Sequence, residues 1–325
     1  MAEDHLEKII EKYRNKEDAL TQLLLEIKKE FNEIPKEAIQ KISKQLNIPV
    51  VEIYRAQDNI VIEQEFLKGT KDENLGVYSD LFSAKSGLNG QDGGIVTALL
   101  INGLKEDIFD SAIVVQRKEG YNAEVVIAED ADEVMAARGT KYLKVSIMPK
   151  LRELINQGKK KIAVVCTPCE VRAARKIQQT LKHDSPNVEI TIIGLFCLEA
   201  FNPAKLKEEI KRLLAIDLDK AEKTQIHKGK FTVQLEEKEY SCKIRDIIQA
   251  AEKGCYYCDD FTSRLADISV GSVGSQSGYS TVIVRSEVGE KLLEGLDVTK
   301  AEVEKEEIIK LSKFKKERAK KSFAP

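Results

Sequence analysis

The sequence predicts an α/β fold, with a mixed β-sheet flanked by helices and preceded by a small N-terminal helical bundle. Two observations support this. In the first sixty residues, apolar side chains recur at helical spacing. From about residue 88, short β-rich runs alternate with helical stretches, a pattern typical of a sheet with at least partly parallel strands.

The N-terminal region, residues 1–58, is expected to form the helical bundle. Pro35 and Pro49 stand where the first turn of a helix accepts proline. The two apolar stripes are Leu20, Leu23, Leu24, Ile27 and Phe31, then Ala38, Ile39, Ile42 and Leu46. The natural role for such a bundle is docking a partner subunit, and the alternative is a bundle that packs only on its own core. Residues 59–87 are expected to be a linker.

Residues 88–290 are expected to form the main domain. Predicted strands lie at 111–115, 124–128, 161–165 and 188–194, a hairpin at 231–244, and two further strands after the segment GCYYC. Helical stretches, including RDIIQAAEKG, separate them. Residues 291–325 are expected to form a charged C-terminal helix or tail.

Composition excludes several classes of protein. The chain has 325 residues, with 52 Lys and Arg against 54 Asp and Glu and a net charge of -2. No overall positive field therefore draws it to nucleic acid or to an acidic membrane. No apolar run approaches the length of a membrane span, and the acidic N-terminus does not resemble a secretory signal. We expect a cytoplasmic protein whose six cysteines are free, metal-bound or catalytic rather than disulfide-bonded.

Five of the six cysteines lie at predicted element boundaries. Cys166 and Cys169 form CTPC between a strand and a helix, Cys197 ends a strand, and Cys255 and Cys258 form GCYYC. In open α/β sheets the ends of the strands are the usual place for a site. Cys242 lies alone within the predicted hairpin.

Four interpretations compete for these cysteines. CTPC alone resembles a thioredoxin-like redox motif. A zinc site could use both pairs, although their separation far exceeds that in a zinc ribbon. The cysteines could also be buried apolar residues. An iron-sulfur cluster accepts scattered ligands, so one from CTPC, one from GLFC and two from GCYYC would suffice. The cluster is favoured because it alone explains all three segments.

Three loops suggest a nucleotide cofactor held by backbone donors. In NGQDGGIVTALL, Gly93 and Gly94 directly precede a helix that contains Thr97, although on this stretch alone a flexible turn with a capping Asp92 is the simpler interpretation. ARGTKYLK adds Arg138, Thr140, Lys141 and Tyr142. VGSVGSQSGYST adds the loop Gly271, Ser272, Val273, Gly274 and Ser275. We assign no catalytic residue, and His183 and His227 are expected to be solvated loop residues.

The ordered motifs QDGGIVTALL, GTKY, CTPCEVRAAR, GLFC, GCYYCDDFTSRLADISVG and GYSTVIVR resemble the coenzyme F420 hydrogenase and dehydrogenase β-subunit family over roughly residues 80 to 290. The resemblance implies FAD, bound around Gly93, Gly94, Thr97, Lys141, Tyr142 and the loop 271–275. It also implies one 4Fe-4S cluster on Cys169, Cys197, Cys255 and Cys258. Cys166 and Cys242 have no role in this pattern. Residues 23–56 resemble the helical start of the 24-kDa thioredoxin-like subunit of NADH dehydrogenases, but the cysteines that hold that subunit's 2Fe-2S cluster are absent.

The resemblance implies an electron-transfer flavoprotein subunit. A hydride would be exchanged between coenzyme F420, a deazaflavin, and FAD, and the cluster would pass single electrons to a hydrogenase, formate dehydrogenase, disulfide reductase or ferredoxin. Arg138 and Lys141 are the candidate cations for the anionic tail of the deazaflavin. One alternative is a self-contained FAD and iron-sulfur reductase of a small substrate. Another is a thiol-disulfide oxidoreductase without flavin.

Overall fold

The computed structural model describes residues 2–14, 16, 19–88 and 90–323. The chain divides into two compact units, residues 1–67 and residues 68–325. No helix among the described residues is both long enough and apolar enough to cross a membrane.

Unit 1 is a bundle of four helices, as the sequence predicts for its first part. The helices are α1 (Ala2–Tyr13), α2 (Leu20–Phe31), α3 (Lys36–Leu46) and α4 (Val50–Phe66). Pro35 and Pro49 are the residues that cap the N-termini of α3 and α4. Asn32 and Asn47 end α2 and α3 in the left-handed conformation, in which asparagine is tolerated. Both predicted apolar stripes contribute to one core of this unit.

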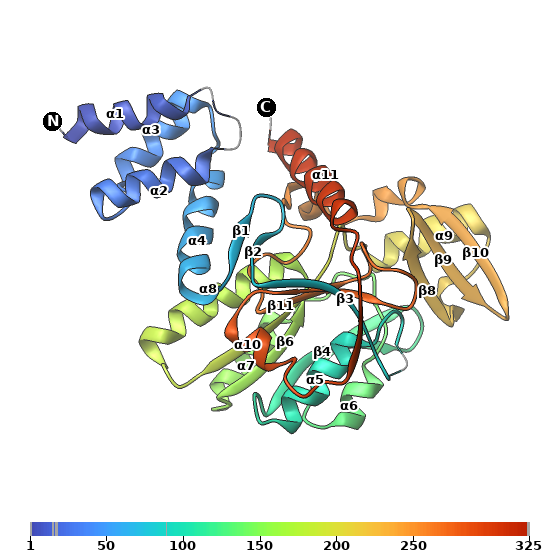
Figure 1. The fold of residues 1–325 in the computed structure, drawn as a ribbon. Coiled ribbons are helices and arrows are strands. Elements are labelled where there is room, and N and C mark those ends of the chain that lie inside the picture. Colours follow the sequence, from blue (N-terminus) through green and yellow to red (C-terminus); the bar gives the residue numbers. More distant parts are fainter. Residues whose placement is uncertain (1, 15, 17–18, 89, 324–325) are drawn as a thin grey trace. The chain divides into compact units, whose positions relative to one another are not determined.

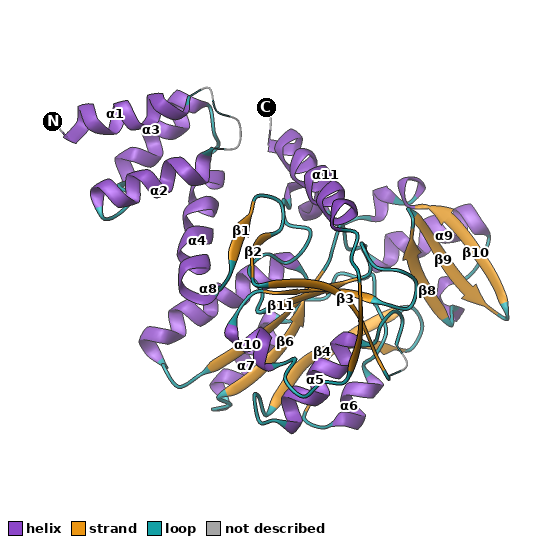
Figure 2. Ribbon diagram, in the orientation of Figure 1, coloured by secondary structure: helices purple, strands orange, loops and turns teal. Residues whose placement is uncertain are grey.

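Unit 2 is built on an eight-stranded mixed sheet in the order β13-β3-β12-β11-β7-β6-β4-β5 (Figures 1 and 2). The pairs β4·β6, β6·β7 and β7·β11 are parallel and the others antiparallel. The strands are β3 (Asp80–Ser86), β4 (Ser111–Lys118), β5 (Asn122–Ala128), β6 (Lys161–Cys166), β7 (Glu189–Leu195), β11 (Ile268–Gly271), β12 (Ser280–Val284) and β13 (Val298–Ala301). The predicted mixed α/β fold is therefore confirmed.

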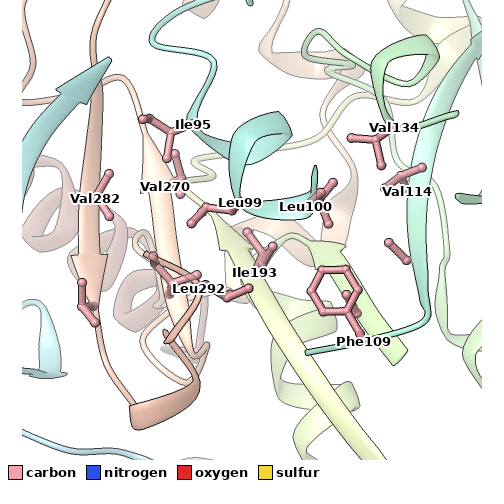
Figure 3. Close-up of a cluster of buried hydrophobic side chains, with 14 of the residues drawn as sticks. Ile95, Leu99, Leu100, Phe109, Val114, Val134, Ile193, Val270, Val282 and Leu292 are labelled. Atoms are coloured by element: carbon pink, nitrogen blue, oxygen red, sulfur yellow. The ribbon is translucent and has the colours of Figure 1, made fainter. Parts of the chain in front are cut away.

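Helices cover both faces of this sheet. On one face α5 (Ile95–Lys105) places Ile95, Leu99 and Leu100 against residues of the strands, among them Val270 and Ile193 (Figure 3). α8 (Pro168–Asp184) packs on β7 from the other face, where Gln178 donates a hydrogen bond to the Ile190 carbonyl. The remaining helices are α6 (Ala131–Ala136), α7 (Met148–Asn156), α9 (Pro203–Leu214), α10 (Glu287–Lys291) and α11 (Lys305–Phe323).

Two smaller sheets complete unit 2. The strands β8 (Lys223–His227), β9 (Lys230–Leu235) and β10 (Lys238–Lys243) form a three-stranded antiparallel sheet that contains the predicted hairpin. β1 (Thr70–Asp72) and β2 (Gly76–Tyr78) form a short hairpin.

A buried polar network fixes the segment that follows GCYYC. Asp267 accepts hydrogen bonds from Arg175, Ser286 and the backbone N–H of Ile192, and it forms an ion pair with Arg175 at 2.8 Å. Arg285, which is fully buried, donates to Ser269 and to the carbonyls of residues 75, 77 and 262. A buried charge is tolerated because it is paired and hydrogen-bonded. This network ties residues 259–269 to the sheet.

Two expectations about individual segments are wrong, and a third is met in part. Residues 59–87 are not a linker, because α4 continues to Phe66 and β3 pairs with β12 and β13 inside the large sheet. RDIIQAAEKG forms short 3-10 helices rather than an α-helix. Within residues 291–323, α11 is the charged C-terminal helix that the sequence predicts, and it buries Ile308, Ser312, Lys315 and Ala319. The preceding β13, which the sequence does not predict, is a strand of the large sheet.

Candidate functional site

The loops with the candidate residues leave one edge of the large sheet. β6, β7 and β11 run parallel, and β3 has the same direction because both β3 and β11 are antiparallel to β12. The loops after β3, β6, β7 and β11 carry Gly93 and Gly94, Cys169, Cys197, and Gly271 to Ser275 respectively. Ligands of open α/β sheets usually bind at this carboxyl edge.

The four predicted ligand cysteines act on one another through their charges. Cys169 lies in the first turn of α8, Cys197 follows β7, and Cys255 and Cys258 lie in and directly after the 3-10 helix Lys253–Tyr257. Burial raises the pKa of the Cys197 thiol to about 12; Lys315 opposes this, and the charges of the other three cysteines add to it. Burial likewise raises the pKa of the Cys255 thiol, and the charges of Cys258 and Cys169 raise it further. The structure therefore brings four thiols from three distant segments into one neighbourhood.

Backbone pairing around Phe201 holds these loops together. Phe201 is fully buried and forms isolated bridges to Leu143 on one side and to Ala251 on the other. Its N–H donates to the Tyr142 carbonyl at 3.0 Å, and the Lys144 N–H donates to the Phe201 carbonyl at 3.1 Å. The segments ARGTKYLK, GLFC and GCYYC are thus placed next to one another.

Three cations that the sequence did not single out surround the thiols. Lys144 Nζ lies 3.8 Å from Cys169 Sγ and 3.8 Å from Glu170. Lys315 is 1% exposed and donates a hydrogen bond to the Cys197 carbonyl. Arg318 donates to the carbonyls of Leu198 at 2.8 Å and Cys255 at 3.2 Å, and it forms an ion pair with Glu199. Positive charge beside thiols stabilises the thiolate, which is the form that binds metal.

The donor set of this neighbourhood is four thiols. Among the described residues, no group of three or more Cys, His, Asp or Glu side chains forms a ready-made site for a metal ion. A four-iron cluster takes one thiolate on each iron, so four cysteines from separate segments, with cations beside them, are the donors that such a cluster requires.

The other two cysteines occupy different surroundings. Cys166 ends β6 and is 3% exposed, and burial raises the pKa of its thiol well above the usual value. Cys242 lies on β10 of the small sheet, opposite Phe231. Of these two, only Cys166 is near a candidate ligand, since the charge of Cys169 contributes to its pKa.

The glycine pair before α5 is tightly packed. A Cβ on Gly93 would lie 2.4 Å from the Ala84 carbonyl oxygen, and the Gly93 N–H donates to Ser280 Oγ at 3.1 Å. Gly94 is the N-cap of α5 with φ 69°, and no side chain caps this helix, so the capping role considered for Asp92 is not found. The first turn of a helix leaves backbone N–H groups without helical acceptors. An uncapped start beside two glycines suits an anionic group.

Gln91 joins this turn to ARGTKY. Its side chain accepts from the Thr140 N–H at 2.9 Å and donates to Tyr142 Oη at 3.1 Å and to the Thr224 carbonyl at 3.2 Å. Tyr142 Oη also accepts from the Ile226 N–H. Two of the predicted loops therefore meet through a residue that the sequence did not mark.

A cavity of about 170 Å³ lies beside Gln91. Its lining includes Arg117, Arg138, Thr140, Lys141, Glu222 and Lys223. Burial and the nearby Arg117 lower the pKa of Lys141 from 10.5 to about 8, while its ammonium donates to the carbonyls of Ala137 and Arg138. A cavity with this excess of cations suits an anionic ligand. His227 ends β8, and the side chain of His183 lies outside the described residues.

The loop 271–275 has a structural reason for each glycine. A Cβ on Gly271 would lie 2.2 Å from the Phe196 ring, and Gly274 has φ 88° and packs against Ile308 of α11. Ser275 Oγ hydrogen-bonds to Ser83 Oγ at 2.8 Å and Thr281 Oγ1 at 2.7 Å. The loop contacts Phe196, the neighbour of Cys197, through Gly271 and contacts β3 through Ser275. It therefore lies between the cysteines and the strand that precedes Gly93 and Gly94. Thr97 of α5 is 9% exposed.

Comparisons with known proteins agree with this arrangement. Residues 82–152 match the model of the coenzyme F420 hydrogenase/dehydrogenase β-subunit N-terminal region, and residues 159–315 match that of its C-terminal region. The coenzyme F420 hydrogenase subunit beta of Methanothermobacter thermautotrophicus is 34% identical over 77% of this chain and 95% of that protein. The chain belongs to this β-subunit family of oxidoreductases.

Two further similar proteins differ in the share of their length that this chain matches. The coenzyme F420-dependent sulfite reductase of Methanocaldococcus jannaschii is 37% identical to this chain. The match covers 74% of this chain but only 41% of the sulfite reductase. A chain in the structure of the F420-reducing [NiFe] hydrogenase complex of Methanosarcina barkeri has a TM-score of 0.73 and 31% identity, covering 78% of this chain and 94% of that one.

Unit 1 has a match of its own. Residues 6–57 match the model of the thioredoxin-like [2Fe-2S] ferredoxin, which confirms the resemblance expected from the sequence. This segment contains no cysteine, so it offers no thiolate for a cluster.

Proposed function

We propose that this chain is an electron-transfer flavoprotein subunit that exchanges a hydride with coenzyme F420 at FAD and passes electrons through one 4Fe-4S cluster to a partner redox protein. The observation that carries the proposal is the meeting of two groups of loops at one sheet edge. The loops with Gly93, Gly94 and Gln91 form one group, and those with four mutually interacting thiols form the other. Family membership supports the same assignment.

The cluster would be held by Cys169, Cys197, Cys255 and Cys258. Lys144 and Lys315 would offset part of the negative charge of four thiolates, and the pairing around Phe201 would keep the three loops in place. The partial burial of Cys197 and the full burial of Lys315 would keep water from part of the site.

FAD would lie along the turn before α5. FAD, when bound, exchanges electrons in pairs with a hydride donor and singly with a cluster. Gly93 and Gly94 would let the backbone approach the pyrophosphate, and the start of α5 would supply N–H donors. We propose that Thr97, Thr140, Tyr142 and residues 271–275 contact this cofactor, as the family resemblance implies.

Coenzyme F420 would place its anionic tail in the cationic cavity. Arg117, Arg138, Lys141 and Lys223 line it, so phosphate and carboxylate groups would find several donors. The docking role expected for residues 1–58 and the cytoplasmic location stay predictions. So does the identity of the partner, among hydrogenase, formate dehydrogenase, disulfide reductase and ferredoxin.

The lowered pKa of Lys141 makes this proposal testable through pH. Below about pH 8 its ammonium attracts the anionic tail, and as pH rises through the pKa that charge is lost. A bound anion favours the protonated form, so the fall in affinity for oxidised coenzyme F420 should begin above pH 8. One charged hydrogen bond corresponds to about a tenfold change in affinity. Fluorescence titration of oxidised coenzyme F420 between pH 7 and pH 9.5 measures it.

Two variants sharpen the test. Lys141→Gln should bind about tenfold more weakly at pH 7, with a flatter profile, and Lys141→Arg should stay tight across the range. Lys238→Gln, at the exposed first residue of β10, is the matched control and should behave as the unmodified chain. Equal affinity of Lys141→Gln and the unmodified chain at pH 7 would place the deazaflavin elsewhere.

A further inference from the structure

The helix α11 has two unlike faces. Its inner face buries Ile308, Ser312, Lys315 and Ala319, which recur at helical spacing. Its outer face consists of exposed residues at the complementary spacing, Lys310, Lys313, Phe314, Glu317, Lys320 and Lys321. A phenylalanine that is 51% exposed among lysines is unusual for a solvated helix.

This outer face lies beside the cysteine loop. Arg318, on the same helix, hydrogen-bonds to the Cys255 carbonyl, and its guanidinium lies 5.6 Å from the centre of the Tyr256 ring and 5.7 Å from that of Phe314. The ring of Tyr257, between Cys255 and Cys258 in sequence, lies 5.1 Å from that of Phe323. Tyr257 is 45% exposed. Exposed aromatic rings therefore adjoin the segment that carries two of the four thiols.

The charge of this face indicates the kind of partner. This outer face has four lysines, Lys310, Lys313, Lys320 and Lys321, against one glutamate, Glu317, although the whole chain has a net charge of -2. Interfaces combine aromatic residues at their centre with charge complementarity at their rim, which speeds association. A positive rim around exposed rings fits a partner with carboxylates around its own redox centre.

We propose that the outer face of α11, together with Tyr257, is the docking surface for an acidic one-electron carrier of the ferredoxin type. This inference rests on the proposed function, because it requires a cluster on the four cysteines. In the reaction, one electron leaves the reduced cluster, the oxidised carrier gains it, and no proton or bond is transferred. The short path from the cysteine loop to the surface rings makes this face suitable for such a transfer.

The test uses the full-length protein, prepared without oxygen, and an acidic bacterial ferredoxin as the probe. After photochemical reduction of the protein, stopped-flow absorbance measures the second-order rate constant of ferredoxin reduction at low and high salt. Lys313→Glu combined with Lys321→Glu should lower this constant at least about tenfold at low salt and weaken its salt dependence. Phe314→Ser should lower it at both salt concentrations, because it removes an apolar contact and no charge.

Controls separate docking from other effects. Lys228→Glu, on the turn between β8 and β9, combined with Lys238→Glu, at the start of β10, makes the same charge change on the small sheet and should leave the rate constant within about twofold. An equal loss in this control, or no loss in the α11 variant, would overturn the proposal. The proposal would also be overturned if sedimentation showed a dimer for the unmodified chain and a monomer for the α11 variant. The outer face of α11 would then bind a second copy of the chain.

Calorimetry distinguishes failure of this inference from failure of the proposed function. Binding of oxidised ferredoxin requires no electron transfer, and iron analysis of the same sample reports the cluster. If ferredoxin binds to protein that contains no iron, and the α11 variant abolishes this binding, the docking surface is supported and the cluster is refuted. Binding that the variant leaves unchanged, in protein with a full complement of iron, would refute the docking surface alone.

Discussion

Replacing any one of Cys169, Cys197, Cys255 or Cys258 by serine is expected to remove most of the iron from the protein. Each of these side chains supplies one thiolate to the proposed cluster, and a serine oxygen is a much harder ligand for iron. The loss should be largest for Cys197→Ser, since this residue is partly buried and the buried Lys315 donates a hydrogen bond to its carbonyl. Iron and acid-labile sulfide analysis of anaerobically purified variants measures the result.

Cys242→Ser and Cys166→Ser are the matched controls. Cys242 lies on β10 in the small sheet, so its replacement should leave iron unchanged. Cys166 is buried at the end of β6, and serine there should cost some stability while retaining iron. An iron content that falls with Cys166→Ser and not with Cys197→Ser would show that the ligand assignment is wrong.

Reduced coenzyme F420 is expected to bleach the flavin at least about a hundredfold faster than NADH or NADPH at equal concentration. This expectation rests on the proposed function, in which the anionic tail of coenzyme F420 occupies the cationic cavity beside Gln91. A hundredfold ratio corresponds to about 2.8 kcal/mol, since each factor of ten is about 1.4 kcal/mol. The chain also lacks a strand followed by GxGxxG, the usual pyrophosphate site of nicotinamide dinucleotides. Anaerobic stopped-flow at the flavin band measures each rate.

The tail of the deazaflavin provides the control for this comparison. A deazaflavin without its phosphate and carboxylate tail should react as slowly as NADH, because it makes no use of the cationic cavity. Lys141→Gln should slow the full coenzyme and leave the truncated one unchanged. Faster bleaching by NADH than by coenzyme F420 would identify a nicotinamide-linked reductase instead.

The sequence predicted the elements whose patterns are local. Runs such as KIAVV and VEITIIG became β6 and β7, and CTPC and GLFC lie at strand ends as expected, because apolar runs between turns are sufficient to mark buried strands. Strand ends that share one sheet edge account for the closeness of Cys169 and Cys197, which follow β6 and β7, whereas the full set of four cysteines was implied by the family resemblance.

Features that depend on distant partners could not be predicted. β3 has few strongly apolar residues and pairs with β12 and β13, about 200 residues away, so the sequence alone predicts only a linker there. RDIIQAAEKG has an apolar pattern compatible with one helix, but Ile247 lies between two separate 3-10 helices, Ile244–Asp246 and Ile248–Ala250. Tertiary packing decided between these outcomes.

The cations of the site were hidden for the same reason. Lys315 is one of several lysines in FKKERAKK and its vicinity, and only the packing of α11 shows that it is the buried one. Lys144 was visible in ARGTKYLK, but its place beside Cys169 depends on the bridge between Leu143 and Phe201. Gln91 likewise acquires its role only when β3, β8 and ARGTKY meet.

The most direct test of the central claim is the cofactor content of protein purified without oxygen. Absorbance spectra together with flavin, iron and acid-labile sulfide analysis should show one FAD, four irons and four sulfides per chain, with flavin bands over a broad cluster shoulder. One equivalent of zinc, with neither iron nor flavin, would contradict the account.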